Sequence, residues 1–307
     1  MERSKFRRPF AHHRVPLRED LIKRQARFTS RSSGAIFAVP KHMAQPSRVG
    51  GFLIDLDGTV IEGGELIPGA VEALMTLVRK NIPYRIVTNT TSKPRSAILA
   101  KMSALGLELH PEQVITAPII GRDYLRRQGI TRCFPLLKPS LLEDLTAIQF
   151  VESSPQAVLV GDIGDALSYD ALNRAFRFLL DGAAFITLAR NRYFRGADGL
   201  CLDVGSIVAA LEYATQREAV LIGKPARDFF LLACESMGAP CETAIAIGDD
   251  LEADVGGAKT AGCTGVLVQT GKFRPDQIEK SKISPDAILG SLACLPSWVE
   301  RLAMLCK

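Results

Sequence analysis

The feature that most constrains the fold is an alternation of short apolar segments and helical segments from residue 50 onward. Apolar segments such as Gly51–Leu56 and Ala244–Ile247 are each followed by a turn and then by a helical pattern. Short, continuously apolar strands that alternate with helices are typical of a parallel sheet covered by helices on both faces. The chain is therefore predicted to be an α/β protein with a Rossmann-like, doubly wound parallel sheet as its core.

Four of the expected strands end at or beside a polar side chain. The strands are predicted at residues 51–56, 84–87, 219–222, 244–247 and 265–268, and the helices at 69–80, 92–105, 228–237 and 252–261. The polar residues at the strand ends are Asp55, Thr88, Lys224 and Asp249. Because ligands of open parallel sheets bind at the carboxyl ends of the strands, these four side chains are expected to converge on one site.

The stretch between Thr88 and Lys224 is too long for a single crossover. It contains its own expected strands at 157–160 and 184–188 and a helix at 169–180. We therefore predict that residues 128–218 form a large inserted α/β domain. Residues 49–127 and 219–307 are predicted to form the core domain around it.

The segment Asp55–Thr59 (sequence DLDGT) predicts a metal site. A strand that ends at Asp55 aims its carboxylate into the crevice, and the glycine of the segment lets the backbone turn so that Asp57 lies alongside. Neighbouring carboxylates repel each other unless a cation lies between them, and oxygen ligands of this kind favour Mg²⁺. Asp249 is expected to be a further ligand. The carboxylates expected to join it or to hold it in place are Asp250 and Asp254.

The remaining polar residues suit a phosphoryl group beside that metal. Lys224 offers a fixed cation, while Thr88 and Asn89 offer a hydroxyl, an amide and backbone N–H groups. Asp55 is predicted to attack phosphorus and form an aspartyl-phosphate. Asp57 is predicted to protonate the leaving oxygen and then to take a proton from the water that hydrolyses the intermediate. The residues thus indicate a phosphatase.

Composition excludes several other classes of protein. Only one histidine, His110, lies outside the first 48 residues, so a histidine base is not expected. Seven cysteines without a CxxC pair argue against a zinc site or a disulfide scaffold and are read as reduced core thiols. No apolar run approaches a membrane span. Residues 1–48 hold twelve basic and three acidic residues, whereas the rest of the chain is slightly acidic, so nucleic-acid binding by the main body is not expected.

Two segments are expected to have no role in catalysis, and a third allows two interpretations. Residues 1–48 are read as a basic, disordered tail, with organelle targeting as the alternative to a cytoplasmic protein. Val160–Asp162 resembles the later Ile247–Asp249 but is read as a plain loop, because no lysine accompanies it in the sequence. Residues 190–195 either face the crevice and contact the substrate or form a solvated loop.

Taken together, the motifs resemble those of the haloacid dehalogenase superfamily, type IIA, over residues 50–307. The matching motifs are Asp55–Thr59, Thr88-Asn89, Lys224-Pro225, and Gly248-Asp249-Asp250 with Asp254. The resemblance implies a hydrolase whose cap domain is inserted between the second and third motifs, with Mg²⁺ as cofactor. It also implies a phosphorylated small molecule as substrate, with no nucleic-acid or membrane partner. A homodimer is compatible with a cap of this size, although no exposed apolar stripe is evident in the sequence.

Carried over motif by motif, the resemblance implies a role for each carboxylate. Asp55 would be nucleophile and metal ligand, Asp57 would offer its backbone carbonyl to the metal and its side chain as acid and base, and Asp249 would complete the ligands. Thr88, Asn89 and Lys224 would hold the phosphate.

One departure from the resemblance concerns Asp57. Members that share further stretches with this chain, such as Thr270–Arg274, carry serine at that position. Aspartate suits phosphate esters with poor leaving groups, so those members' substrate preference is not transferred. Sugar phosphates, phosphoglycolate, nucleotides, pyrophosphate and phosphoamino acids all stay open. The alternatives to an enzyme are a phospho-acceptor signalling module and a binding protein that keeps the fold without turnover.

Overall fold

The computed structural model describes residues 49–196 and 199–305 and confirms the predicted α/β fold around a six-stranded sheet. The strand order is β15-β14-β13-β1-β4-β5, and every neighbouring pair is parallel. The strands are β1 (Gly51–Asp55), β4 (Tyr84–Thr88), β5 (Val114–Thr116), β13 (Ala244–Gly248), β14 (Thr264–Val268) and β15 (Ala287–Leu289). The sequence predicted four of these; β5 and β15, each of three residues, were not expected.

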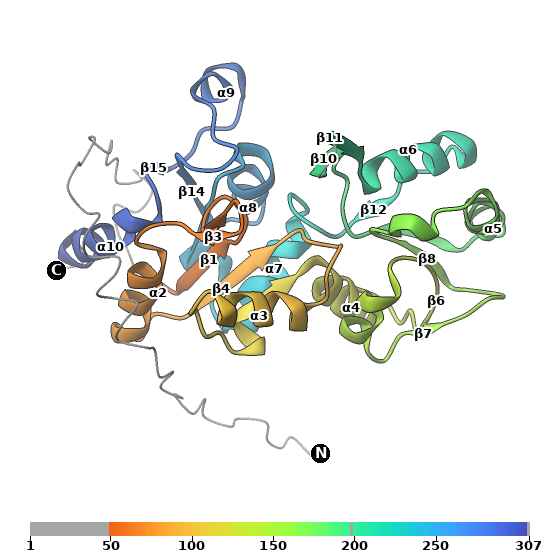
Figure 1. The fold of residues 1–307 in the computed structure, drawn as a ribbon, viewed down its shortest axis with the longest axis horizontal. Coiled ribbons are helices and arrows are strands. Elements are labelled where there is room, and N and C mark those ends of the chain that lie inside the picture. The colour runs from red at the N-terminus through yellow and green to blue at the C-terminus, as the bar shows by residue number, and fades with distance from the viewer. Residues whose placement is uncertain (1–48, 197–198, 306–307) are drawn as a thin grey trace, which may run out of the picture.

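Helices cover both faces of this sheet, as a doubly wound fold requires (Figure 1). The helices of the core are α2 (Ala70–Arg79), α3 (Arg95–Ala104), α4 (Ala117–Arg127), α7 (Arg227–Met237), α8 (Gly257–Thr260), α9 (Pro275–Lys280) and α10 (Leu295–Leu305). In β1, Phe52 and Ile54 pack with residues of α2, α3 and α10, whereas Leu53 packs with residues of α4, α7 and α8. This alternation follows from the two-residue period of a strand.

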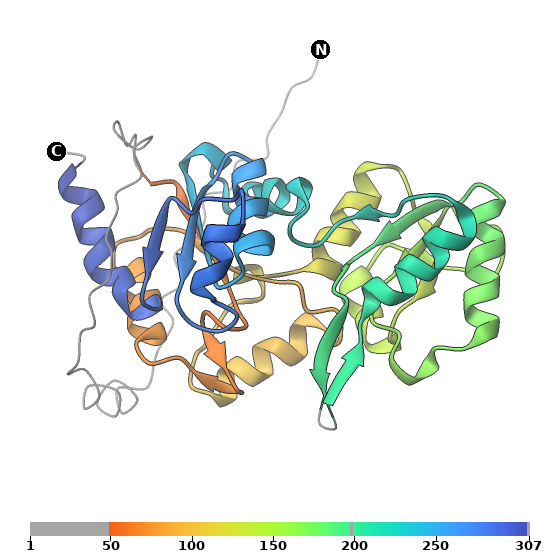
Figure 2. The ribbon, with the colours of Figure 1, turned by 90° about the horizontal axis from the view of Figure 1, so that it is seen from above.

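The inserted segment builds a second parallel sheet, of order β12-β9-β8-β6-β7, beside the first (Figure 2). Its strands are β6 (Arg132–Leu136), β7 (Gln149–Phe150), β8 (Ala157–Val160), β9 (Ala184–Thr187) and β12 (Val220–Leu221). Helices α5 (Tyr169–Leu180) and α6 (Val204–Thr215) pack on one face through apolar side chains such as Leu179 and Val208.

Sheet membership corrects one prediction. The strand expected at 219–222 was assigned to the core, but Val220 and Leu221 pair with Ile186 and Thr187 of β9 in the second sheet. A two-residue strand carries too little pattern to show which sheet it joins. The core therefore resumes after this strand rather than at residue 219, and Lys224 does not follow a strand of the main sheet.

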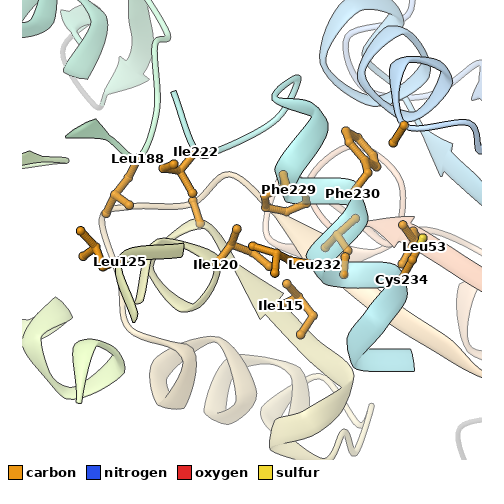
Figure 3. Packing of buried hydrophobic residues seen from close by; sticks show 14 of the residues in the cluster. Leu53, Ile115, Ile120, Leu125, Leu188, Ile222, Phe229, Phe230, Leu232 and Cys234 are labelled. Carbon is orange, nitrogen blue, oxygen red and sulfur yellow. The ribbon is translucent and has the colours of Figure 1, made fainter. Parts of the chain in front are cut away.

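An apolar cluster continues from the core into the inserted domain. Figure 3 shows Leu188 and Ile222 from the insert beside Ile120 of α4 and Phe229 of α7. Packing is tight here, because a Cβ added at Gly121 would lie 2.5 Å from Leu188 Cδ2. The core and the inserted domain therefore share one continuous apolar cluster within the described residues.

Two hairpins complete the fold: β2 (Ile61–Glu62) with β3 (Glu65–Leu66), and β10 (Tyr193–Gly196) with β11 (Gly199–Leu202). The second hairpin projects from the inserted domain (Figure 2). Tyr193 lies opposite Leu202, and these two side chains and Leu200 are 61%, 81% and 66% exposed. An exposed apolar group of this kind was not evident in the sequence, because its members are brought together by strand pairing.

Cysteines also group in a way that their spacing did not show. The sulfur atoms of Cys234, Cys241 and Cys263 lie within 4.8 Å of one another in the buried core. The Cys263 thiol and burial raise the pKa of Cys234, and burial raises the pKa of Cys241 to about 12, so these two thiols stay protonated. They match the predicted role of reduced core thiols, although the sequence did not indicate a cluster.

The structure bears on the prediction about membranes but does not describe the segment to which the prediction about targeting applies. The basic tail, residues 1–48, lies outside the described residues. No helix within the described parts of the chain is both long and apolar enough to cross a bilayer.

Candidate active site

The carboxylate of Asp55 lies at the end of β1, the central strand that pairs with β13 on one side and β4 on the other. Its side chain is buried, and its Oδ1 accepts a hydrogen bond of 2.5 Å from Lys224 Nζ. Its other oxygen, Oδ2, is buried and has no hydrogen-bond partner among the described residues. An orphaned buried carboxylate oxygen is costly unless a further positive group meets it.

Lys224 reaches this point on a loop. Its side chain is 5% exposed and donates to Asp55 Oδ1 and, at 2.6 Å, to Asp254 Oδ1. Asn89 holds the loop: its Nδ2 donates to Lys224 O (2.8 Å), and Lys224 N donates to Asn89 Oδ1 (2.7 Å). Both ends of this amide are thus engaged. The side chain of Asn89, expected to contact the phosphate, therefore positions the lysine; its amide nitrogen carries two N–H groups, and the bond to Lys224 O uses one of them.

Asp249 and Asp254 come from the end of β13 and the turn after it. The sequence predicted one helix over 252–261, but the structure has a π-helical turn (Leu251–Gly256) followed by the four-residue α8. π-turns inside helices are frequent at functional sites because they re-aim side chains. Here Asp254 Oδ2 accepts from the backbone N of Asp250 (3.1 Å) while its Oδ1 meets Lys224. Asp254 therefore holds the lysine, whereas the sequence predicted that it would join Asp249 at the metal or hold Asp249 in place.

Asp57 and Thr88 line the same site, Asp57 as an exposed residue and Thr88 as a buried one. Asp57 is exposed and its Oδ2 accepts a long hydrogen bond of 3.4 Å from Thr90 Oγ1. Thr90 also bonds to Thr88 Oγ1, through its hydroxyl at 2.9 Å and its backbone N at 3.1 Å. Asp57 therefore faces the cleft with its carboxylate only loosely held, beside the buried nucleophile candidate.

A loop that was not assigned a role in the sequence ties these segments together. Thr270 Oγ1 donates to Gly58 O (2.5 Å), and the backbone N of Lys272 donates to Asp249 Oδ2 (2.6 Å). Gly58 and Gly271 both have positive φ, and a Cβ added to either would lie about 2 Å from Asp249 Oδ2. Both positions therefore need glycine. This loop follows the carboxyl end of β14. Because ligands of parallel sheets bind at the carboxyl ends of strands, the same reasoning applied to β14 would have indicated this loop.

Charge in the site is unbalanced. Carboxylate oxygens of Asp55, Asp249 and Asp254 lie within 4.8 Å of one another around the single buried ammonium of Lys224. Burial raises the pKa of Asp55, and Asp254 and Asp249 add to this against the pull of Lys224. Burial likewise raises the pKa of Asp249 to about 6. Burial opposes the charge on Lys224, yet Asp254 and Asp55 hold its pKa above the ordinary value.

These observations fit a divalent cation. The cluster carries more negative charge than one lysine offsets, it consists of oxygen donors, and one of its buried oxygens has no partner. Hard cations such as Mg²⁺ prefer such donors. Asp250 contributes less directly: its Oδ1 accepts from the N–H groups of Glu252 and Ala253, and its Oδ2 pairs with Lys272 Nζ at 3.2 Å. It caps the turn that carries Asp254.

The aspartates border a cleft of about 300 Å³ that the inserted domain also lines. The lining residues from the insert are Lys138, Asp162, Asn191, Phe194 and Asp203. This corrects the interpretation of Asp162 as part of a plain loop, since it lines the cleft and pairs with Lys138 at 2.7 Å. The two are 24 residues apart, so no local motif linked them. Of the polar residues between 190 and 195, Asn191 lines the cleft, while Arg190 pairs with Glu212. Phe194 also lines the cleft, although the sequence did not indicate this residue.

Sequence comparisons identify the family. A model described as haloacid dehalogenase-like hydrolase matches residues 52–151, and one described as HAD-hydrolase-like matches residues 221–295. Haloacid dehalogenase-like hydrolase domain-containing protein 2 of Homo sapiens is 40% identical over 76% of this chain and 89% of its own length. The phospholysine phosphohistidine inorganic pyrophosphate phosphatase of Homo sapiens is 35% identical over 80% of this chain and 92% of its own.

Solved structures agree. A 4-nitrophenylphosphatase from Thermotoga maritima superposes with a TM-score of 0.75 at 31% identity, covering 81% of this chain and 97% of that one. NagD from E. coli gives a TM-score of 0.75 at 25% identity, covering 80% and 98%. Identity of this extent over most of both chains, with the acidic site assembled at the strand ends, places this protein in the haloacid dehalogenase-like hydrolase family.

Proposed function

We propose that the protein is a Mg²⁺-dependent phosphatase that acts on a phosphorylated small molecule through an aspartyl-phosphate on Asp55. The observation that carries the proposal is the contact of 2.5 Å between Lys224 Nζ and Asp55 Oδ1, made across 169 residues of chain inside a buried carboxylate cluster. Two relatives support it, since one is named as a phosphatase of phospholysine, phosphohistidine and pyrophosphate and the other as a 4-nitrophenylphosphatase.

Three groups would hold the metal: the carboxylates of Asp55 and Asp249 and the backbone carbonyl of Asp57. When bound, Mg²⁺ supplies positive charge that offsets the charge of the phosphate oxygens and of the carboxylates. Lys224 provides a second, permanent positive charge, and its two carboxylate partners keep it protonated. The hydroxyl of Thr88 and the backbone N–H of Asn89 complete the anion site.

In the first half-reaction, a carboxylate oxygen of Asp55 attacks phosphorus as the bond from phosphorus to the leaving oxygen breaks. The electron pair of that bond stays with the leaving oxygen, and Asp57 donates a proton to it. Asp57 is exposed to the cleft while Asp55 is buried, so the two carboxylates are suited to different tasks. The product is the dephosphorylated alcohol or amine, and the phosphoryl group stays on Asp55.

In the second half-reaction, water attacks the phosphorus of the aspartyl-phosphate. Asp57, now a carboxylate, takes a proton from that water, and the bond from phosphorus to Asp55 breaks. Inorganic phosphate leaves and both side chains return to their starting states. An aspartate at position 57 makes this step fast, which separates an enzyme from a phospho-acceptor module that must keep its phosphoryl group.

Turnover of p-nitrophenyl phosphate with Mg²⁺ tests the proposal. The Asp55→Asn variant is expected to be inactive, and chelation of Mg²⁺ should silence the wild type reversibly. Asp181→Asn, an exposed change at the end of α5, serves as control and should leave turnover intact. Activity of Asp55→Asn within tenfold of wild type would rule out the nucleophile. A phosphoryl adduct on the wild type that lasts for minutes would favour the phospho-acceptor reading.

The substrate and the cellular compartment stay predictions from the sequence. Phosphoamino acids and pyrophosphate remain candidate substrates beside phosphate esters. A cytoplasmic location is the prediction from the sequence; the sequence leaves the oligomeric state open, and sedimentation of the purified protein would distinguish a monomer from a homodimer.

A further inference from the structure

The side of the cleft that faces the aspartates carries its own set of polar groups. The inserted domain lines it with Lys138, Asp162, Asn191, Phe194 and Asp203. The aspartates and Lys224 on the core side are occupied by the phosphate chemistry proposed above. The part of a substrate that leaves would therefore lie against these five side chains, four of which are able to form hydrogen bonds.

Lys138 and Asp162 form a preorganised pair within this lining. Lys138 Nζ donates to Asp162 Oδ2 (2.7 Å), and the backbone N of Lys138 donates to Asp162 O (2.7 Å). Asp162 Oδ1 accepts from Gly164 N (2.8 Å). Gly164 has a φ of +57°, and a Cβ added there would lie 2.5 Å from Lys138 Cε, so the loop packs closely on the lysine stem. A ligand that binds these two side chains therefore loses little free energy to ordering them.

The pair still offers hydrogen bonds to the cleft. The two side chains are 34% and 20% exposed, so neither is sealed off by its partner. An ammonium has three donors, and Lys138 uses one on Asp162; a carboxylate has several acceptor positions, and Asp162 has some left. Lys138 therefore presents a donor to the cleft and Asp162 an acceptor, and the two groups lie 2.7 Å apart.

Such a pair selects by charge. A carboxylate or second phosphate drawn to Lys138 would meet the repulsion of Asp162, and an ammonium drawn to Asp162 would meet that of Lys138. Two neighbouring hydroxyls suffer neither, because each can donate to the aspartate or accept from the lysine. The arrangement thus favours a neutral, polyhydroxylated leaving group over a charged one.

The other lining residues and the size of the cleft agree with this. Asn191 offers a further donor and acceptor, and Phe194 offers a flat apolar face for the C–H groups of a sugar ring. Asp203, whose Oδ1 accepts from Val204 N, adds a second carboxylate to which hydroxyls can donate and which repels anions. A volume of about 300 Å³ lies at the small end of ligand sites, which suits a single ring or a short polyol.

We propose, on the basis of the phosphatase function above, that the substrate is a phosphorylated monosaccharide or polyol and that Lys138 and Asp162 bind two of its neighbouring hydroxyls. The two residues determine specificity and take no part in the transfer of phosphate.

The proposal is tested first on the wild type. The ratio kcat/KM is measured for hexose, pentose and polyol monophosphates, for phosphoglycolate and phosphoethanolamine, and for p-nitrophenyl phosphate. We expect the hydroxylated substrates to exceed phosphoglycolate and phosphoethanolamine by roughly tenfold or more, the effect of one or two well-placed hydrogen bonds. If either charged substrate ranks above every sugar and polyol phosphate, the proposal is overturned. This ranking needs no variant and so does not depend on whether a variant folds.

A double variant, Lys138→Met with Asp162→Asn, then tests the residues. Selectivity, the kcat/KM for the best sugar or polyol phosphate divided by that for p-nitrophenyl phosphate, should fall roughly 10- to 100-fold. Arg190→Met with Glu212→Gln removes another ion pair of the same domain outside the cleft and should leave selectivity unchanged. Unchanged selectivity in a folded Lys138/Asp162 variant would refute the assignment. A wild type inactive on every substrate, p-nitrophenyl phosphate included, would instead refute the phosphatase function itself.

Discussion

Replacement of Lys224 by methionine tests whether the buried cluster depends on its one cation. The change removes hydrogen bonds of 2.5 and 2.6 Å to Asp55 and Asp254 and leaves their carboxylates buried beside Asp249. Breaking a buried ion pair by removing one partner costs about 3–5 kcal/mol, because the remaining charge stays buried and unpaired. This is a large fraction of the 5–15 kcal/mol that holds a typical domain folded.

The loss has a predicted dependence on pH. Lys224 opposes the rise that burial causes in the pKa of Asp55, so without the lysine this pKa lies further above its unfolded-state value and the folded state binds more protons than the unfolded state. Stability then falls as pH rises, and the deficit of the variant is larger at pH 8 than at pH 5. Added Mg²⁺ should recover part of it at pH 8, because the ion would bind the carboxylates of Asp55 and Asp249 in the folded state only.

Urea unfolding in metal-free buffer measures the deficit, with the fluorescence of Trp298 as probe. This is the single tryptophan of the chain, and it is 1% exposed in α10, in contact with Phe52 of β1, so it reports on the core domain. Lys280→Met is the matched control, since that lysine is 76% exposed and its loss should leave the midpoint unchanged. A Lys224→Met midpoint equal to wild type at pH 8, or a deficit that grows toward low pH, would refute the reasoning.

Three further predictions concern the same site. Asp57→Asn should slow hydrolysis of a phosphate ester with a poor leaving group by about 10²–10⁴, and p-nitrophenyl phosphate less; equal losses on both would argue against an acid role. Burial raises the pKa of Asp249 from 3.8 to about 6. The folded state therefore holds the proton of this carboxyl more tightly than the unfolded state, and the metal-free protein becomes less stable as the pH rises through that interval. Mg²⁺ should therefore raise the Tm more at pH 7.5 than at pH 5, and the opposite order would contradict this. Thr270→Val removes the hydrogen bond to Gly58 O and should raise the Mg²⁺ concentration for half-maximal activity by roughly tenfold, whereas Thr270→Ser should restore the wild-type value. Thr243→Val, which removes a local hydrogen bond to Pro240 O, is the control, and an equal effect in that variant would show that the Thr270 effect is non-specific.

Much of the core was predictable because its signals are local. Buried parallel strands read as short apolar runs, and the predictions for β1, β4 and β13 agree with the observed bounds within a residue. The helix predicted at 169–180 has those bounds as α5, where Ser168 accepts from Ala171 N as the cap and the helix amphipathicity is strong. Local signals failed for very short elements, such as β12, and for the π-turn at Leu251–Gly256, where side-chain spacing cannot distinguish a π-turn from an α-helix.

The candidate site divides in the same way. The sequence indicated which residue types would meet, because each stands at or beside a strand end or in a motif: Asp55, Asp57 and Asp249 could be named without coordinates. It could not show that the side-chain amide of Asn89 forms hydrogen bonds with the backbone of Lys224, since the two residues are 135 positions apart. Nor could it show that Thr270 reaches Gly58 across 212 residues.

The sequence by itself therefore determined the sheet-and-helix architecture of the core and the acidic chemistry at its edge, because hydrophobic period and strand ends are written in consecutive residues. Only the tertiary structure decided which side chains complete the cleft. Lys138 and Asp162 stand in unremarkable loops 24 residues apart, and they become a paired, cleft-lining unit only because β6 and β8 lie side by side in the second sheet. Contacts of this kind depend on the packing of whole elements, which no local pattern encodes.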